Sequence, residues 1–351
     1  MDISLFRRLL ALACLTVFCL PPAHGLAAKA RSRASQARRK TKAPAVKMRP
    51  RSLKAHQPPQ YVGAARNADP APILPTSEDL ATPISRAYQV SQGNTLHLKI
   101  RAPQELATAS TIFGGLSHTF SPIPCADRYY ECFIPVDCEQ APGDYKVVIK
   151  TTTSTGEVKR LGCSVTVNPF SFKQQRGFRV ARSKLRQLKR AGAGIGGSRE
   201  SKLLAKYIKA SPKQKWWAGP FRIPINLQYV TSPFGEIRTS HGLGKRHHRG
   251  IDMADSPRAP IYAAHHGKIA VKTRTPASGN VIAIDHGLGV FTVYCHMDSF
   301  AKNLNIGDMV QQGQQIGRIG MTGYASGHHL HLEMRVNNIA VDFMPWTKEI
   351  Y

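Results

Sequence analysis

The apolar residues of this chain recur mostly at every second position, in short runs that are typical of β-strands. From residue 216 to residue 351 glycines separate these runs, which are 261–264, 267–271, 281–284, 290–294 and 330–336. This region contains no long stretch with helical periodicity. The pattern predicts a C-terminal domain over residues 216–351 that is an all-β, largely antiparallel sheet assembly, and a chain that is mostly β.

A second β region precedes this domain. Between residues 81 and 170, alternating runs at 96–100, 145–149 and 163–167 are separated by clusters of Gly and Pro. Because alternate side chains of a strand point to opposite faces, each run can bury one face in a core. The pattern predicts a small antiparallel β-sandwich of immunoglobulin-like type. The region shows no nucleophile with a base and a partner, which favours a scaffold or a binding module.

A basic linker with one short helix is predicted between the two β regions, over residues 171–215. Ser198 can cap the start of the helix, and Pro212 ends it. Four apolar residues share one helical face: Leu203, Leu204, Tyr207 and Ile208. A glycine-rich stretch before the helix lacks the preceding strand and the following Lys-Ser/Thr of a phosphate loop, so we interpret it as a flexible connection.

The N-terminus has the features of a signal peptide over residues 1–25. Arg7 and Arg8 precede an apolar run, 9–20, which is too short for a comfortable membrane span of about 20 residues. We expect secretion across the inner membrane into the periplasm or cell envelope. After signal cleavage no transmembrane helix is predicted.

The chain is strongly basic, with a formal net charge of +28, which predicts attraction to a polyanion. Residues 26–80 form a basic segment that is too polar to bury a core, so a disordered linker is predicted there. Anionic envelope polymers are the expected partners of the basic segments. Nucleic acid is an alternative that rests on charge alone and gives the histidines no role, so no specific nucleic acid is expected.

Export also predicts disulfides. Two of the seven cysteines, Cys14 and Cys19, lie in the signal peptide, and four others fall within the sandwich region: Cys125, Cys132, Cys138 and Cys163. Four cysteines allow three connectivities, among which the sequence does not choose.

The candidate chemistry lies in the C-terminal domain. His248 and Asp252 stand four residues apart, and His329 and His331 stand two apart, so the latter pair can face one groove from a strand. His248, Asp252 and His331 suit a zinc ion with one coordination position left for water, which indicates a hydrolase. His248 is preferred over His247 because it has the carboxylate four positions on. His247 and His329 remain alternative ligands.

Several motifs in residues 217–346 together resemble the lysostaphin/LytM-type zinc endopeptidases of bacterial cell walls. In chain order the matching segments are 231–235 with Arg238, 248–252, 279–287, 294–297, 307–310, 313–317, 320–323 and 329–331. The resemblance implies that His248, Asp252 and His331 hold one Zn²⁺ per chain. It further implies that His329 and His296 flank the bound water and the substrate carbonyl.

From this resemblance we expect His329 to act as general base and His296 to steady the developing oxyanion. Arg238 and Asn280 are candidate substrate-binding residues, with satisfaction of a turn as the alternative for each. The chain departs from the family pattern at His328, where members typically have Pro, and at Cys295, which is expected to be a thiol facing away from the groove.

The function predicted from the sequence is that of a secreted zinc-dependent endopeptidase that hydrolyses peptide cross-links of bacterial peptidoglycan. Its expected substrates are the peptidoglycan stem peptides. The alternative is a catalytically silent wall-binding module that activates another cell-wall hydrolase. Relatives of that kind have lost metal ligands, whereas this chain retains all three candidates.

Overall fold

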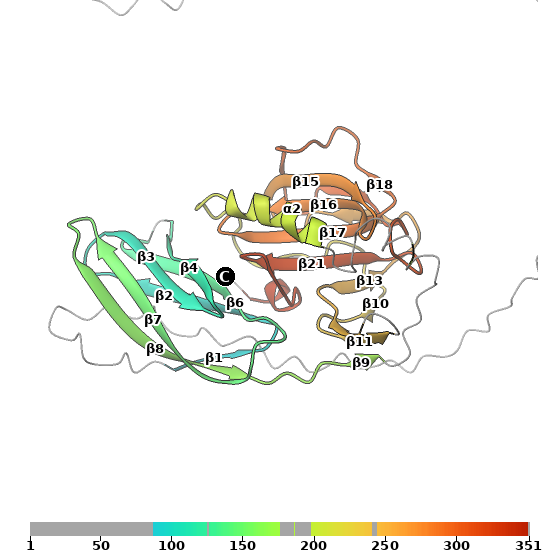
Figure 1. Ribbon diagram of the computed structural model, residues 1–351. Coiled ribbons are helices and arrows are strands. Elements are labelled where there is room, and N and C mark those ends of the chain that lie inside the picture. The colour runs from blue at the N-terminus through green and yellow to red at the C-terminus, as the bar shows by residue number, and fades with distance from the viewer. Residues whose placement is uncertain (1–86, 125, 176–185, 187–197, 241–243, 350–351) are drawn as a thin grey trace, which may run out of the picture. The chain divides into compact units, whose positions relative to one another are not determined.

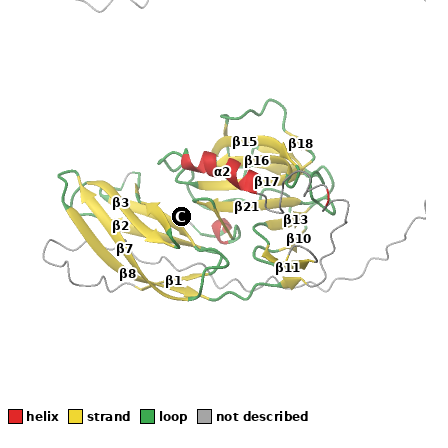
Figure 2. Cartoon of the chain, viewed as in Figure 1, coloured by secondary structure: helices red, strands yellow, loops and turns green. Residues whose placement is uncertain are grey.

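Strands dominate the computed structural model of the chain (Figures 1 and 2). The structure describes all residues except 1–86, 125, 176–185, 187–197, 241–243 and 350–351. The predicted signal peptide and basic disordered linker therefore lie outside the described residues, as does much of the linker after the sandwich. No helix among the described residues is long and apolar enough to cross a membrane.

The first β domain is built from two sheets. Its strands are β1 (Ala87–Ser91), β2 (Thr95–Arg101), β3 (Leu106–Phe113), β4 (Leu116–Thr119), β5 (Ser121–Pro122), β6 (Tyr129–Pro135), β7 (Gly143–Thr153) and β8 (Val158–Asn168). Five of them form a sheet in the order β1-β8-β7-β3-β4, and the others form a sheet in the order β2-β6-β5. Side chains from both sheets share one buried core, among them Leu96, Ile134 and Val165. This is the two-layer arrangement that the alternating pattern predicted.

One pairing in this domain differs from the antiparallel expectation. Strand β1 runs parallel to β8, with Ala87 opposite Ser164 and Ser91 opposite Asn168. The other pairings in the sandwich are antiparallel. Alternation along a strand fixes which face is buried but not the direction of its neighbour, so the sequence pattern could not reveal this parallel edge.

The disulfides expected from export are not formed among the described cysteines. Cys132, Cys138 and Cys163 are free and buried, and Cys125 lies outside the described residues. Burial raises the pKa of the Cys163 thiol to about 11. These side chains therefore behave as small apolar groups of the core rather than as disulfide cross-links.

The C-terminal domain is organised around a larger sheet. Its strands are β10 (Tyr229–Ser232), β13 (Ile251–Ala254), β15 (Gly267–Thr275), β16 (Gly279–Asp285), β17 (Val290–Met297), β19 (Met309–Val310), β21 (Leu330–Val336) and β22 (Ile339–Val341). They follow the order β10-β13-β21-β17-β16-β15-β19, and β22 pairs with β21. Every pairing in this sheet is antiparallel, as the sequence predicted.

Two small sheets complete the domain. One contains β9 (Gln174–Gln175), β11 (Ile237–Ser240) and β12 (Gly244–His247), and the other contains β14 (Pro260–Tyr262), β18 (Ser299–Phe300) and β20 (Gln315–Arg318). A short 3₁₀ helix, η1 (Pro345–Thr347), lies near the C-terminus.

The large sheet is covered on both faces. On one face lies the main core, which includes Tyr294, Met297 and Leu332. Helix α2 (Ser198–Lys209) packs against the other face through the four apolar residues that the sequence pattern assigned to its buried side (Figure 1). Cys295 belongs to this second cluster, so it points toward the helix and away from the main core. Cys295 also stands directly opposite His331 in the pairing of β17 with β21, so the two side chains share one face of the sheet. The expectation that the Cys295 thiol faces away from the groove is therefore wrong.

The sandwich domain contributes one aromatic residue to the main core. The Phe133 ring lies 5.5 Å from that of Trp217 and 5.9 Å from that of Trp346, between ring centroids. An ion pair adjoins it, in which Lys215 Nζ lies 3.3 Å from Glu131 Oε1 and both side chains are largely buried. The described residues belong to one compact unit.

Candidate metal centre

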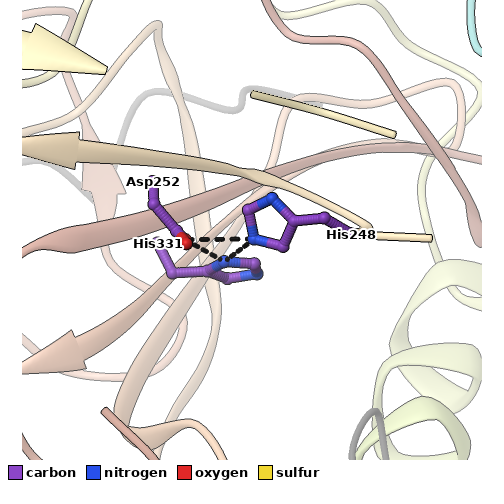
Figure 3. A group of neighbouring side chains, drawn as sticks. All are labelled: His248, Asp252 and His331. Atoms are coloured by element: carbon purple, nitrogen blue, oxygen red, sulfur yellow. Dashed lines mark hydrogen bonds and ion pairs between the residues drawn. The ribbon is translucent and has the colours of Figure 1, made fainter. Parts of the chain in front are cut away.

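Two neighbouring strands bring a carboxylate and an imidazole together. Strands β13 and β21 are antiparallel, and in their register Asp252 stands directly opposite His331. Directly opposed side chains project from the same face of a sheet. His331 Nδ1 consequently lies 2.7 Å from Asp252 Oδ1 (Figure 3).

The third side chain of the cluster, His248, comes from the loop between β12 and β13. Backbone bonds hold it on both sides, since His248 N donates to Glu236 O at 2.9 Å and Gly235 N donates to His248 O at 2.8 Å. Its Nε2 lies 3.0 Å from His331 Nδ1 and 3.1 Å from Asp252 Oδ1 (Figure 3).

Gly250 permits this approach. A Cβ at that position would lie 2.6 Å from Leu332 O and 2.7 Å from the His331 ring. The glycine in the 248–252 motif therefore lets the chain pass against the His331 ring.

The three atoms fit a zinc ion. Their separations of 2.7, 3.0 and 3.1 Å form a small triangle, and these residues are the group that could hold a metal ion among the residues described. Zinc bonds of about 2.0–2.1 Å in tetrahedral geometry separate ligand atoms by roughly 3.3 Å, so a small relaxation would admit the ion. Two imidazoles and one carboxylate leave a fourth position open.

The electrostatics of the triad favour a positive charge between its members. Burial lowers the pKa of His331, but hydrogen bonds to Asp252 and Glu333 outweigh burial and raise it to about 9. Burial raises the pKa of Asp252, but the neighbouring histidines outweigh burial and hold that pKa well below its usual range. A divalent cation would take the place of the proton that lies between His331 Nδ1 and Asp252 Oδ1.

Each imidazole of the triad has a hydrogen-bond partner behind it. His248 Nδ1 donates to Pro233 O at 3.0 Å, which leaves Nε2 for the metal. His331 Nε2 donates to Glu333 Oε1 at 3.2 Å, which leaves Nδ1. Glu333 Oε2 in turn accepts a 2.6 Å bond from Arg335 Nε. Such partners orient metal ligands and select the tautomer.

Arg238 supports the carboxylate of the triad. Its Nη2 lies 2.9 Å from Asp252 Oδ2 and 2.6 Å from Ser232 Oγ. The sequence prediction gave Arg238 a substrate-binding role, with a turn as the alternative. The structure shows the guanidinium bound to the oxygen of Asp252 that faces away from the triad, which holds Oδ1 toward the metal position.

Two further histidines lie beside the triad. The His296 and His329 ring centroids are 5.0 Å apart, and the His296 ring is 5.9 Å from that of His331. His329 Nε2 lies 3.8 Å from Asp252 Oδ1. The structure thus brings together all five histidine and aspartate residues that the sequence singled out.

His296 is held in an unusual state. Its φ of 59° places a non-glycine residue in the left-handed region, where the register between β16 and β17 shifts. Burial, followed by the charges of His331 and His329, lowers the pKa of His296 to about 3, so it is neutral at physiological pH. Strained conformations of this kind are concentrated at functional sites.

Residues 246–343 match the family described as Peptidase family M23. The C-terminal domain is a member of peptidase family M23. The candidate triad and the two flanking imidazoles all fall within the matched residues.

Curated relatives match the same part of the chain. A peptidoglycan DD-endopeptidase, ShyB of Vibrio cholerae, is 36% identical over 126 residues, which cover 35% of this chain and 29% of that protein. A DD-carboxypeptidase/endopeptidase, Mpg of Neisseria meningitidis, is 36% identical over 125 residues, which cover 35% of this chain and 28% of that protein. The chain therefore matches less than a third of the length of either relative.

Solved structures of peptidases are also similar to the chain. A peptidase M23 structure from Pseudomonas aeruginosa covers 73% of this chain and 94% of its own, with 20% identity and a TM-score of 0.49. The catalytic domain of lysostaphin from Staphylococcus simulans covers 41% of this chain and 98% of its own, with 28% identity and a TM-score of 0.28.

Asn280 of the M23 domain bonds to backbone. Its Nδ2 lies 3.0 Å from Met297 O and 3.0 Å from Asp298 O, so the side-chain amide joins β16 to the end of β17. Of the two roles that the sequence left open for Asn280, these contacts favour the structural one.

The rival histidines lie differently from the triad. His247 Nδ1 donates to Gly235 O at 3.1 Å, and its ring packs edge-on against Phe172, so His247 is engaged elsewhere. His328 is exposed. His329 Nδ1 is bonded to Gly327 O, and its Nε2 lies 3.8 Å from Asp252 Oδ1, so His329 is a neighbour of the group of three.

Sequence reasoning missed three supporting residues of the M23 domain: Ser232, Thr322 and Glu333. Glu333 carried a readable signal, because it stands two residues after His331 on the same strand and therefore shares its face. Ser232 and Thr322 lie in the matching segments 231–235 and 320–323, but their contacts with Arg238 and His296 carried no signal, since these depend on how distant segments pack.

Proposed function

We propose that this chain is a secreted zinc-dependent endopeptidase that hydrolyses peptide cross-links of bacterial peptidoglycan. The observation that carries the proposal is the triad of His248, Asp252 and His331 with two further imidazoles beside it. A purely structural zinc site would be closed by a fourth protein ligand, whereas three ligands leave room for water and substrate.

The triad would hold the ion, and the flanking groups would handle protons. A bound zinc supplies Lewis acidity that lowers the pKa of water to about 7 and polarises the scissile carbonyl. His329 is the proposed general base, because its Nδ1 is bonded to Gly327 O at 2.9 Å and its Nε2 lies 3.8 Å from Asp252 Oδ1. Its free lone pair can therefore accept a proton near the metal position.

His296 is the group proposed to steady the developing oxyanion. Its Nδ1 bonds to Thr322 O at 2.9 Å, so a neutral His296 presents a lone pair on Nε2. To donate a hydrogen bond to an oxyanion, Nε2 must first gain a proton. The His329 ring, 5.0 Å away, is a nearby source of the proton taken from water.

The substrate proposal rests on the relatives. Those named DD-endopeptidases favour peptidoglycan stem peptides as the substrate and a bond between D-amino acids as the bond cut. Secretion into the periplasm or envelope, and attraction of the basic segments to anionic envelope polymers, belong to the same proposal.

The test is digestion of purified peptidoglycan sacculi, with released fragments identified by mass. Wild-type protein should release stem-peptide fragments, and a metal chelator should stop the release. The His329→Ala variant should retain its metal but release little. A wild-type protein that binds sacculi and leaves their composition unchanged would instead support the silent wall-binding module.

A further inference from the structure

Backbone carbonyls of the segment 320–329 bind both histidines that flank the triad, one of which, His329, ends the segment. His296 Nδ1 lies 2.9 Å from the carbonyl oxygen of Thr322, and His329 Nδ1 lies 2.9 Å from that of Gly327. A carbonyl oxygen can only accept a hydrogen bond, so each imidazole must carry its proton on Nδ1. In the neutral state both rings therefore have their lone pair on Nε2.

The Thr322 side chain fixes this segment to the β16–β17 hairpin. Its Oγ1 donates to Met297 O at 2.7 Å and accepts from Asn280 N at 2.9 Å. One hydroxyl thus bridges the strand that carries His296 to the strand beside it. The position of the Thr322 carbonyl relative to the His296 ring depends on this bridge.

The backbone of the segment is also joined at several points. Tyr324 N donates to Ala277 O at 2.7 Å, and His329 N donates to Gly320 O at 3.3 Å. The second bond joins the two ends of the segment, so the segment forms a loop. This loop carries both the Thr322 carbonyl that binds His296 and the Gly327 carbonyl that binds His329. A displacement of this loop would therefore act on both imidazoles.

Two glycines allow the loop to come so close to the hairpin. Gly279 and Gly323 have φ values of 67° and 73°, which other residues rarely adopt. A Cβ on Gly323 would lie 2.6 Å from Ala277 O and would also overlap the backbone nitrogen of Gly279. This contact gives a physical reason for the 320–323 motif, which neither the metal triad nor the base explains.

We propose that Thr322 is a positioning residue that sets the Nδ1–H tautomer of His296 and, through the 320–329 loop, supports that of His329. The inference rests on the proposed function, in which these imidazoles handle the protons of hydrolysis. Thr322 acts through His296 and is not itself a catalytic residue. In the proposed function Nε2 of His296 takes up the proton that His329 removes from water, so the other tautomer presents an N–H where that lone pair is needed.

The test compares Thr322→Val, which removes the hydroxyl at nearly constant shape, with Thr322→Ser, which retains it. Thr347→Val is the matched control, because Thr347 Oγ1 also donates to a carbonyl at 2.7 Å, that of Met344. The full-length, metal-free proteins are labelled with ¹⁵N-histidine, and the imidazole tautomers are assigned by NMR near pH 8. Thermal unfolding of all three variants separates loss of the fold from loss of position.

We expect wild type, Thr322→Ser and Thr347→Val to show His296 with its proton on Nδ1. Thr322→Val should show a mixture of the two tautomers. With zinc added, its kcat on sacculus fragments should fall roughly five- to tenfold, as expected for the loss of about one hydrogen bond, with KM and metal content unchanged.

A wild-type His296 with its proton on Nε2 would overturn the proposal. So would a Thr322→Val protein with an unchanged tautomer and kcat, or a Thr322→Ser protein as impaired as Thr322→Val. The NMR measurement needs neither metal nor substrate. If wild type carries the Nδ1–H tautomer but cuts no peptidoglycan, the proposed function fails while the positioning of His296 stands.

Discussion

Glu333 offers a sharp test of how the fold tunes the metal centre. Its Oε1 accepts a bond from His331 Nε2 at 3.2 Å, and Oε2 accepts one from Arg335 Nε at 2.6 Å. The charge of Arg335 and the bonds from His331 outweigh burial and keep the pKa of Glu333 well below its usual range. The carboxylate is thus ionised and increases the basicity of the histidine that would bind metal.

The perturbation is Glu333→Gln, which keeps the side-chain size and one oxygen but removes the negative charge. Loss of a partner behind a metal ligand typically lowers metal affinity about 10–100-fold, which corresponds to about 1.4–2.7 kcal/mol. The low end is expected if the amide oxygen still faces His331. The high end is expected if the amide group turns and leaves His331 Nε2 without an acceptor.

The assay is competition for zinc between the metal-free protein and a chromophoric chelator at constant pH. Glu157→Gln is the control, because Glu157 is a half-exposed carboxylate on the sandwich that pairs with Lys159 and lies outside the M23 domain. Only Glu333→Gln should weaken zinc binding. A zinc affinity within about twofold of wild type, with an intact fold, would refute the reasoning.

Three other predictions follow from the same structure. His329→Ala should lower kcat by about 10²–10⁴-fold while zinc content stays at the wild-type level, because His329 lies outside the triad. Arg238→Lys should weaken zinc binding several-fold in the chelator assay, because one guanidinium nitrogen, Nη2, bonds to both Asp252 and Ser232, and the shorter lysine side chain places its nitrogen one bond short of that position. Burial raises the pKa of Asp342 to about 6, which outweighs its bond from Met344 N and the charge of Lys348. Its folded pKa lies above the unfolded one, so the stability it contributes is present below about pH 4 and is lost as the pH rises through about 6. The free energy of unfolding of Asp342→Asn, measured in urea, should therefore equal that of wild type near pH 4 and exceed it near pH 8 by up to about 3 kcal/mol.

Each of these predictions has an opposing result. Loss of zinc from His329→Ala would make that histidine a ligand. An unchanged affinity in Arg238→Lys would return the arginine to the substrate-binding role predicted from the sequence. A constant stability difference between Asp342→Asn and wild type across the pH range would show that Asp342 does not titrate with the raised pKa.

The sequence predicted the sheets well because their signal is local. Alternation along a run such as 281–284 shows a strand and its buried face without knowledge of its neighbours. Helix α2 was predicted for the same reason, from the spacing of Leu204 and Ile208. The parallel pairing of β1 with β8 was not predicted, because pairing partners far apart in sequence leave no local pattern.

The candidate site was predictable only in part. His248 and Asp252 lie close in sequence, but His331 comes beside them only through the pairing of β13 with β21. The order of motifs in a known family suggested this proximity, whereas alternation alone could not have predicted it. Supporting contacts were harder still. The bond from Arg238 to Asp252 and that from His296 to Thr322 join segments that only tertiary packing brings together.

The central claim is that His248, Asp252 and His331 hold one catalytic zinc ion, and its most direct test is elemental analysis coupled to sacculus digestion. Natively purified wild type should contain one zinc per chain and release peptidoglycan fragments, and Asp252→Ala should contain little zinc and release none. A wild-type protein without metal, or an Asp252→Ala protein that digests sacculi as wild type does, would contradict the account.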